Sequence, residues 1–166
     1  MIQPTMGYCT KRQYKYFLKN VNNWEKELIK KGIFLIKIYL SVDKHTQIKR
    51  FKIRRNHSLK YWKLSKNDIN SLSKWESYSY YKLLMFEKTS TEFSPWTVIN
   101  SNNKLTARLN AIRYVLECID YHNKINLKPK SWSIEENEKK IRISGVLFDN
   151  LSNEQYKLLN EVKQII

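Results

Sequence analysis

One segment of the chain constrains the fold more than any other. From Ile33 to Leu40 nearly every residue is apolar, and most are β-branched or aromatic. Such a short, continuous apolar run predicts a strand that is buried on both faces, as in a parallel sheet covered by helices. A second, shorter run from Trp96 to Asn100 predicts another strand. Two strands are too few for such a sheet, so we expect part of it to be missing or to be supplied by a partner.

Amphipathic helices are predicted on either side of these strands. Thr10 and Gln13 form the capping box of a first helix, and Asn22 or Asn23 is expected to begin a second helix that ends at Gly32. Further helices are expected over residues 43–55, 65–88 and 105–119, with a polar loop at residues 56–64. Strands that alternate with helices predict an α/β layered fold.

The charge of the chain indicates its partners. The net charge is +16, which favours ligands rich in phosphate, such as nucleic acid, nucleotides, polyphosphate or an anionic membrane. Between Lys44 and Asn67 there are nine Lys and Arg residues and no Asp or Glu. Unmixed charge repels itself unless a ligand offsets it. This segment therefore predicts a surface that binds a polyanion, the alternative being a generic basic surface.

Four side chains of this segment are the candidate phosphate ligands. Arg50 and Arg54 lie one helical turn apart, so their guanidinium groups share a helix face and can each hold two phosphate oxygens. Lys60 and Lys63 flank Trp62 in the polar loop and act there as point charges.

The glycine content excludes one kind of phosphate site. The three glycines lie far apart, at Gly7, Gly32 and Gly145. A loop that cradles phosphate with its backbone needs several glycines close together, so this chain contains no such loop. No apolar run reaches the roughly 20 residues of a membrane span, and the N-terminus has no apolar signal region. We therefore expect a cytoplasmic protein without membrane contacts.

Short motifs occur along the chain in a characteristic order. They are Met6-Gly7-Tyr8-Cys9-Thr10, Arg50-Phe51 with Arg54, Leu59-Lys60-Tyr61-Trp62-Lys63-Leu64-Ser65 with Asp68, Trp75 with Tyr78, Pro95-Trp96, and Lys104 with Ala107-Arg108-Leu109-Asn110. In order and spacing, from Met6 to about Tyr121, these motifs resemble the polyphosphate kinase 2 family.

The resemblance implies a fold, a reaction and ligands. It implies a P-loop-kinase fold that transfers phosphoryl groups between inorganic polyphosphate and a nucleoside mono- or diphosphate (ADP/ATP or AMP/GDP), with Mg²⁺. A lid at about residues 44–68 would grip the phosphate chain, and phosphoryl transfer depends mainly on such positioning and charge neutralisation. The lid residues implied are Arg50, Arg54, Lys60 and Lys63, and the residues implied near the nucleotide are Lys104 and Arg108.

The departures from the family pattern are equally specific. The family's glycine-rich loop and its element with a metal-linked acid have no counterpart here, and Asn102 and Asn103 stand where the family has two Asp residues. We therefore expect the Mg²⁺ ligands to be missing, with no complete catalytic set and no metal site. The chain is expected to be the C-terminal half of the fold and inactive alone. A complementing N-terminal fragment is the expected partner if the enzyme is split, and a decayed remnant is the other interpretation.

The last part of the chain differs from the rest. Residues 122–166 carry a net charge of +2, which leaves +14 for residues 1–121, the truncated kinase-like domain. A strand within residues 140–148 and a helix capped by Ser152 predict a short α+β tail of unknown role. A different function class stays open as well: a non-catalytic basic module that holds polyphosphate or nucleic acid. The sequence leaves the nucleotide acceptor open, and also whether the chain forms a homo-oligomer.

Overall fold

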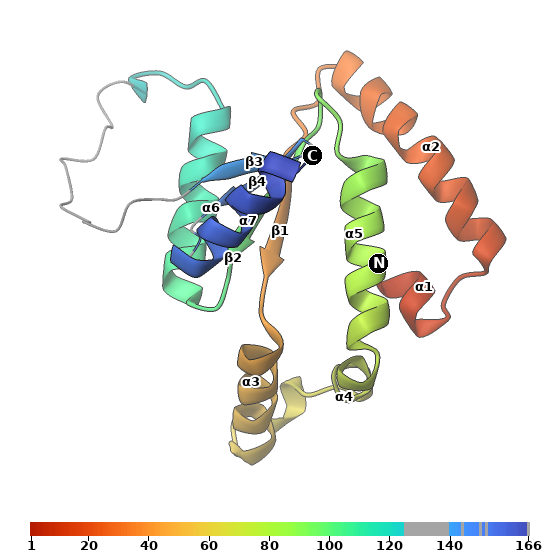
Figure 1. Cartoon of the computed structure of the whole chain (residues 1–166), viewed down its shortest axis with the longest axis vertical. Coiled ribbons are helices and arrows are strands. Elements are labelled where there is room, and N and C mark those ends of the chain that lie inside the picture. Colours follow the sequence, from red (N-terminus) through yellow and green to blue (C-terminus); the bar gives the residue numbers. More distant parts are fainter. Residues whose placement is uncertain (125–139, 144, 150, 152, 166) are drawn as a thin grey trace.

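The computed structural model describes residues 1–124, 140–143, 145–149, 151 and 153–165 (Figure 1). Its elements follow in the order α1 (Ile2–Met6), α2 (Lys11–Lys30), β1 (Lys37–Ser41), α3 (Lys44–Asn56), the 3₁₀ turn η1 (Tyr61–Lys63), α4 (Lys66–Ser73), α5 (Trp75–Thr89), β2 (Trp96–Asn100), α6 (Lys104–Cys118), β3 (Ile141–Ile143), β4 (Val146–Asp149) and α7 (Asn153–Ile165). No helix in the described part of the chain is long and apolar enough to cross a membrane.

The four strands form one open sheet in the order β1-β2-β4-β3. Strands β1, β2 and β4 are parallel, and β3 runs antiparallel to β4. The layered α/β fold is therefore confirmed. The two strands expected in residues 1–121 are not left alone on this side of the sheet, because the tail of the same chain folds back and adds β4 beside β2. Within the described residues β1 pairs with β2 alone, which leaves the outer edge of β1 without a neighbour.

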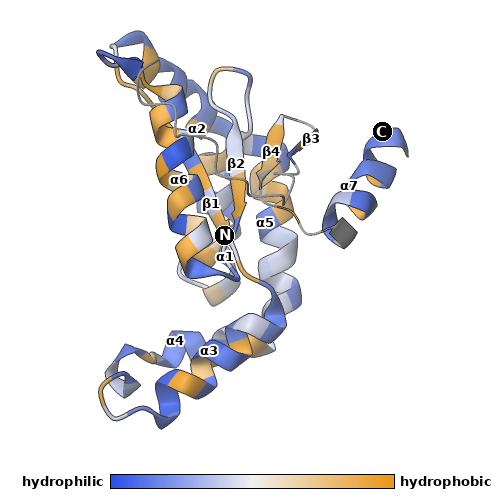
Figure 2. Cartoon of the chain, turned by 90° about the vertical axis from the view of Figure 1, so that its left-hand side faces the viewer, coloured by the Kyte–Doolittle hydropathy of each residue, from blue (hydrophilic) through white to orange (hydrophobic). Residues whose placement is uncertain are grey.

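Helices α5 and α6 cover opposite faces of the sheet (Figure 2). On the α5 face, Phe86 packs with Val98 of β2 and Val146 of β4, and partly buried aromatic side chains of β1 and β4 surround them. On the other face, Thr97 and Ile99 of β2 are fully buried, and α6 packs against that strand. The core is therefore centred on β2, which is the only strand predicted with its observed bounds.

Two predictions about the first half of the chain are wrong. The strand begins at Lys37 rather than Ile33, and Leu40 is 55% exposed, so β1 is not buried on both faces. Its α6-side face lacks cover because α6 lies over β2. The two helices expected before it are one continuous helix, α2, because Asn22 donates a hydrogen bond from Nδ2 to the Lys88 carbonyl instead of capping a new helix (2.8 Å).

Two further elements differ from their predicted form. The long helix expected from Ser65 is broken at Lys74, whose Nζ donates to the Thr5 carbonyl at 3.2 Å, so that α4 and α5 are separate helices. The strand expected in the tail is a hairpin that turns at Gly145, where φ is +76°. The predicted helix cap Ser152 lies outside the described residues, and the division of the chain at residue 121 stays a prediction.

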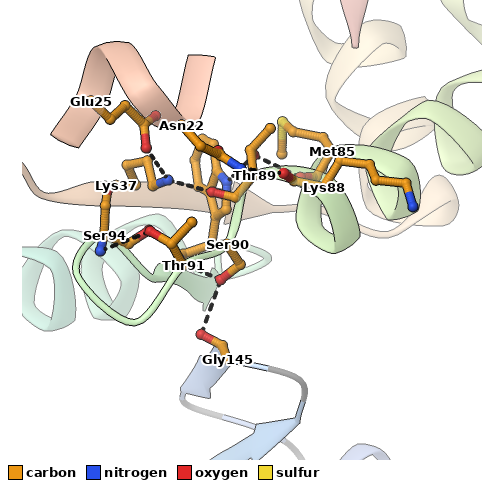
Figure 3. A network of polar contacts seen from close by, with 11 residues as sticks. Asn22, Glu25, Lys37, Met85, Lys88, Thr89, Ser90, Thr91, Ser94 and Gly145 are labelled. Carbon is orange, nitrogen blue, oxygen red and sulfur yellow. Dashed lines mark hydrogen bonds and ion pairs between the residues drawn. The ribbon is translucent and has the colours of Figure 1, made fainter. Parts of the chain in front are cut away.

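A buried ion pair joins α2 to the sheet. Lys37 Nζ lies 2.7 Å from a Glu25 carboxylate oxygen, and the two side chains are only 7% and 9% exposed. The same ammonium group donates to the Thr89 carbonyl at the end of α5. Ser90, next in sequence, donates to the Gly145 carbonyl of the tail hairpin (3.0 Å). Figure 3 shows how these contacts tie α2, β1, α5 and the tail together at one point.

Candidate phosphate-binding site

The loops that follow β1 and β2 meet at the carboxyl edge of the sheet, where ligands bind in open α/β folds. Asp43, just after β1, caps α3 by accepting a hydrogen bond from the Thr46 amide (2.6 Å). Its own amide donates to Asn102 Oδ1 (3.1 Å), and Asn102 Nδ2 donates back to the Asp43 carboxylate. This reciprocal pair fixes the start of α3 relative to the loop before α6.

Arg50 reinforces the same junction from the middle of α3. Its Nη2 atom donates to the carbonyl oxygens of Ser101 (2.6 Å) and Asn102 (3.0 Å). One end of the guanidinium group is therefore engaged with the loop, while a guanidinium carries five N–H donors in total. The structure thus gives Arg50 a positioning role that its sequence pattern did not indicate. Its expected contact with phosphate stays a prediction for the remaining donors.

Basic side chains from three segments converge beside this junction. The pKa of Lys104, at the start of α6, lies below its ordinary value, first because the positive charge of Arg50 is close. Slight burial and the charges of Arg54, Arg108 and Lys60 lower it further. We call these five residues the basic cluster. Five of the six candidate residues are thus close enough for their charges to act on one another at Lys104, and together they raise the positive potential beside this edge of the sheet. Their contact with phosphate stays a prediction.

Arg54 is held in the cluster by an acid. Its Nη1 atom lies 3.9 Å from the Asp68 carboxylate, and both side chains are about one-third exposed. Asp68 at the same time accepts hydrogen bonds from the Ser65 amide and hydroxyl in the capping box of α4 (both 2.9 Å). A contact between exposed charges at this distance is weak. A phosphate group can therefore compete with Asp68 for Arg54.

Lys63, the sixth candidate, has a different setting. Its ammonium group lies over the Trp62 ring, 5.0 Å from the ring centroid, and Trp62 Nε1 donates to the Leu59 carbonyl (3.1 Å). Tyr61 and Trp62 are both largely exposed. The predicted lid thus contains a short turn that presents two aromatic rings and two lysines to solvent.

A cavity of about 510 Å³ adjoins the carboxyl edge on the α5 side. Its polar wall includes Asp43, Lys44 and Asn102, and its apolar wall includes Leu158 and Leu159 of α7. Lys82 of α5 also lines it, and burial lowers the pKa of this lysine. The sequence did not assign Lys82 or α7 to the site, because neither belongs to a motif and only the fold brings them to the strand ends.

The described residues offer little to a divalent metal. No group of three or more His, Cys, Asp or Glu side chains lies close enough together within them to hold an ion. The acids of the site, Asp43 and Asp68, cap helices and have amide or guanidinium partners. The donor set of the described residues therefore does not fit Mg²⁺, which is bound through carboxylates and substrate phosphates.

The capping role of Asp43 gives a testable pH dependence. Hydrogen bonding from Thr46 is the main cause that lowers the pKa of Asp43, so the carboxylate stabilises the fold above its unfolded pKa and loses this effect as pH falls through the folded value. We expect Asp43→Ala to cost about 1 kcal/mol of unfolding free energy at pH 7. The difference from the unaltered chain should shrink below about pH 4, as urea unfolding at several pH values would show. Asp43→Asn can still cap the helix, so it should lower the unfolding free energy less than Asp43→Ala does. An equal loss in the two variants would contradict the capping role of Asp43.

Comparisons with known proteins agree with the motif pattern. The family model for polyphosphate kinase 2 (PPK2) matches residues 1–127. The GDP-polyphosphate phosphotransferase of Mycolicibacterium smegmatis is 45% identical over 123 residues, which cover 74% of this chain and 44% of that protein. The ADP-polyphosphate phosphotransferase 1 of Rhizobium meliloti is 42% identical over 123 residues, with 74% of this chain and 41% of that protein covered.

Solved structures give the same result at the level of the fold. A polyphosphate kinase 2 crystal structure from Pseudomonas aeruginosa PA01 superposes with a TM-score of 0.67 at 29% identity, covering 79% of this chain and 27% of that one. The corresponding structure from Arthrobacter aurescens TC1 gives a TM-score of 0.63 at 28% identity, with coverage of 75% and 44%. The chain spans less than half the length of these relatives, and the matched family region contains the whole basic cluster.

Proposed function

We propose that this chain, which belongs to the polyphosphate kinase 2 family, grips inorganic polyphosphate for phosphoryl transfer to or from a nucleotide. Homologues of the chain are named as polyphosphate phosphotransferases of GDP or ADP. The observation that carries the proposal is the convergence of Arg50, Arg54, Lys60, Lys104 and Arg108 beside the carboxyl edge of the sheet.

The cluster suits the electrostatic demands of the reaction. A phosphoryl group in transfer needs little covalent help from protein, but its charge must be neutralised and its oxygens held in place. Arg50 is fixed by the loop carbonyls and forms a rigid base for the cluster. Arg54 is held only by Asp68 and can exchange that carboxylate for a phosphate. We therefore propose that α3 and the η1 turn move towards bound polyphosphate.

We further propose that transfer requires a second stretch of polypeptide. The chain has no glycine-rich loop, and its described acids do not form a Mg²⁺ site. The outer edge of β1 has no neighbour within the described residues, and this edge is where a further parallel strand fits. The loop after such a strand would lie beside Asp43 and the basic cluster, because carboxyl ends of parallel strands share one edge. The complementing stretch would hold Mg²⁺ and the nucleotide phosphates there.

The test separates binding from transfer. Purified chain is expected to bind a polyphosphate of defined length in calorimetry. With polyphosphate, Mg²⁺ and ADP or GDP it is expected to form no ATP or GTP above a no-protein control. Adding the part of the Mycolicibacterium smegmatis relative that precedes its matched region is expected to give transfer. A chain that fails to bind polyphosphate would refute the gripping role, and transfer by the chain alone would refute the need for a complement.

A second candidate function rests on the exposed aromatic rings of the η1 turn. Tyr61 and Trp62 lie between Lys60 and Lys63, and this combination suits stacking of unpaired bases along a charged backbone. In that case a 20-residue oligouridylate should bind more tightly than polyphosphate of equal charge, and Trp62→Ala should weaken oligouridylate binding alone. We expect instead that polyphosphate binds more tightly than the oligouridylate at matched salt.

A further inference from the structure

The cavity of about 510 Å³ at the carboxyl edge of the sheet lies between α5 and the tail helix α7. Val98 of β2 and Phe148 of β4 line it from the sheet. Asn100, at the end of β2, donates a hydrogen bond to Gln155 Oε1 of α7 (3.4 Å), which ties the tail to this edge. Small-molecule sites in proteins have volumes of roughly 300–1,000 Å³. The cavity is therefore walled by this chain itself and is large enough for such a ligand.

Lys82 occupies an unusual position on α5. It follows Trp75 by two helical turns and precedes Phe86 by one, so the three side chains share one face of the helix. Phe86 is buried against the sheet, and Trp75 lines the same cavity as Lys82. Within the part of the chain that the structure describes, the Lys82 ammonium group has neither a hydrogen-bond acceptor nor an acid partner. It therefore lacks the counter-charge that partly buried charges normally have.

Lys37 shows what Lys82 lacks, because Lys37 has a carboxylate oxygen 2.7 Å away and a carbonyl acceptor as well. Asp43, an acid that lines the cavity, is already engaged by the hydrogen bonds of the α3 junction. The other wall of the cavity includes Leu158 and Leu159 of α7. An unpaired cation beside an apolar wall fits a ligand with one anionic group and an apolar body. If the ammonium group were simply hydrated at the mouth of the cavity, the charge of a ligand would make no difference.

We infer that this cavity is a binding site for a small organic anion, with the anionic group on Lys82 and a flat apolar body against α7. A chain of inorganic phosphate does not fit, because it has no apolar surface to place on the leucines of α7. The absent strand is expected beside the outer edge of β1, whereas β4, and β3 which α7 contacts, lie on the other side of β2. The site is separate from the basic cluster, and the inference does not depend on the proposed function.

Titration calorimetry with naphthalene-2-sulfonate tests the site. The sulfonate should bind at least about tenfold more tightly than neutral naphthalene-2-sulfonamide, which has nearly the same shape but no charge for Lys82. Lys82→Met should remove this difference by weakening the sulfonate and leaving the sulfonamide nearly unchanged. Lys88→Met is the matched control on the same helix and should change neither, because the Lys88 ammonium group is exposed and paired with Glu87 (2.6 Å). Equal binding of the two probes, or full sulfonate affinity in Lys82→Met, would overturn the inference.

Mapping of lysine acetylation by mass spectrometry locates the probe. Naphthalene-2-sulfonate should protect Lys82, but not Lys88, from N-hydroxysuccinimidyl acetate. Leu109→Glu, on the exposed apolar face of α6, should leave sulfonate binding unchanged, and loss of binding there would place the probe outside the cavity.

Two competitors test what else fills the cavity. Tripolyphosphate should not displace naphthalene-2-sulfonate, and displacement would assign the cavity to the phosphate site instead. The part of the Mycolicibacterium smegmatis relative that precedes its matched region should also leave the probe bound. Loss of the probe on adding that part would show that the absent half of the fold fills the cavity, which would refute the inference. Polyphosphate binding by Lys82→Met should be unchanged, so failure here is distinct from failure of the gripping role.

Discussion

Replacing Arg54, Lys60 and Lys104 together by alanine is expected to weaken the binding of inorganic polyphosphate by about 100-fold or more. Arg54 and Lys60 lie close enough to Lys104 for their positive charges to lower the pKa of its ammonium group. A charge-assisted contact to phosphate that is partly open to solvent contributes about 1 kcal/mol, and three of them contribute about 3 kcal/mol, a factor of roughly 100. Titration calorimetry with a polyphosphate of defined length, at constant ionic strength, gives the comparison.

The matched control removes the same charge from another surface. Lys11, Lys15 and Lys19 are exposed on α2, far in sequence from the cluster, and their joint replacement by alanine lowers the net charge by the same amount. This variant should lose no more than about threefold in affinity, because screened charges at a distance contribute little. An equal loss in the two triple variants would mean that net charge alone binds the polyanion, and the basic cluster would lose its assignment.

The salt dependence of polyphosphate binding gives an independent measure of the number of phosphate contacts. Each phosphate contact releases counterions, so the slope of log affinity against log salt falls by about 0.7 per contact for a single-stranded polyanion. The cluster variant should therefore show a slope shallower by about 2 than the unaltered chain. The α2 variant should keep the original slope.

Local patterns predicted the elements that depend on neighbours in sequence. The capping boxes of Thr10 with Gln13 and of Ser65 with Asp68 are present, and β2 has its predicted bounds. From the sequence, only the order of the family motifs could predict that the candidate residues of α3 and α6 lie close together. In the structure the loops before these two helices are joined by the Asp43–Asn102 contact, which spans 59 residues. Helical periodicity cannot show such a contact.

Long-range pairing limited what the sequence could show. The tail has no motif in the matched family region, so nothing in its pattern indicated that β4 would pair with β2. The hydrogen bonds from Arg50 to two backbone carbonyls likewise could not be predicted from the sequence, because any residue type carries a backbone acceptor. The helix at 105–119 was predicted to be amphipathic, but only the fold shows that its apolar residues Leu109, Ile112 and Leu116 are exposed rather than packed against the sheet.

Lys37 shows the same limit and leads to the largest stability effect that we expect. In the sequence it is one polar residue within an apolar run, and in the structure it is buried with Glu25 as its partner at 2.7 Å. Glu25→Ala leaves a buried ammonium group that keeps its hydrogen bond to the Thr89 carbonyl and its position 5.4 Å from the Trp96 ring centroid, but has lost its counter-charge. Removing one partner of a buried pair costs about 3–5 kcal/mol, which is a large share of the stability of a chain of this size. Urea unfolding at pH 7 should show this loss.

The chain contains a matched pair that tests burial as the cause. Glu27 and Lys30, on the same helix, are also 2.7 Å apart, but both side chains are about 60% exposed. Glu27→Ala should therefore cost less than about 0.5 kcal/mol. The double variant Glu25→Leu with Lys37→Met removes both buried charges and keeps most of the volume, so it should recover most of the loss caused by Glu25→Ala. If the double variant were as unstable as Glu25→Ala, the cost would come from lost packing at this junction rather than from the unpaired charge of Lys37.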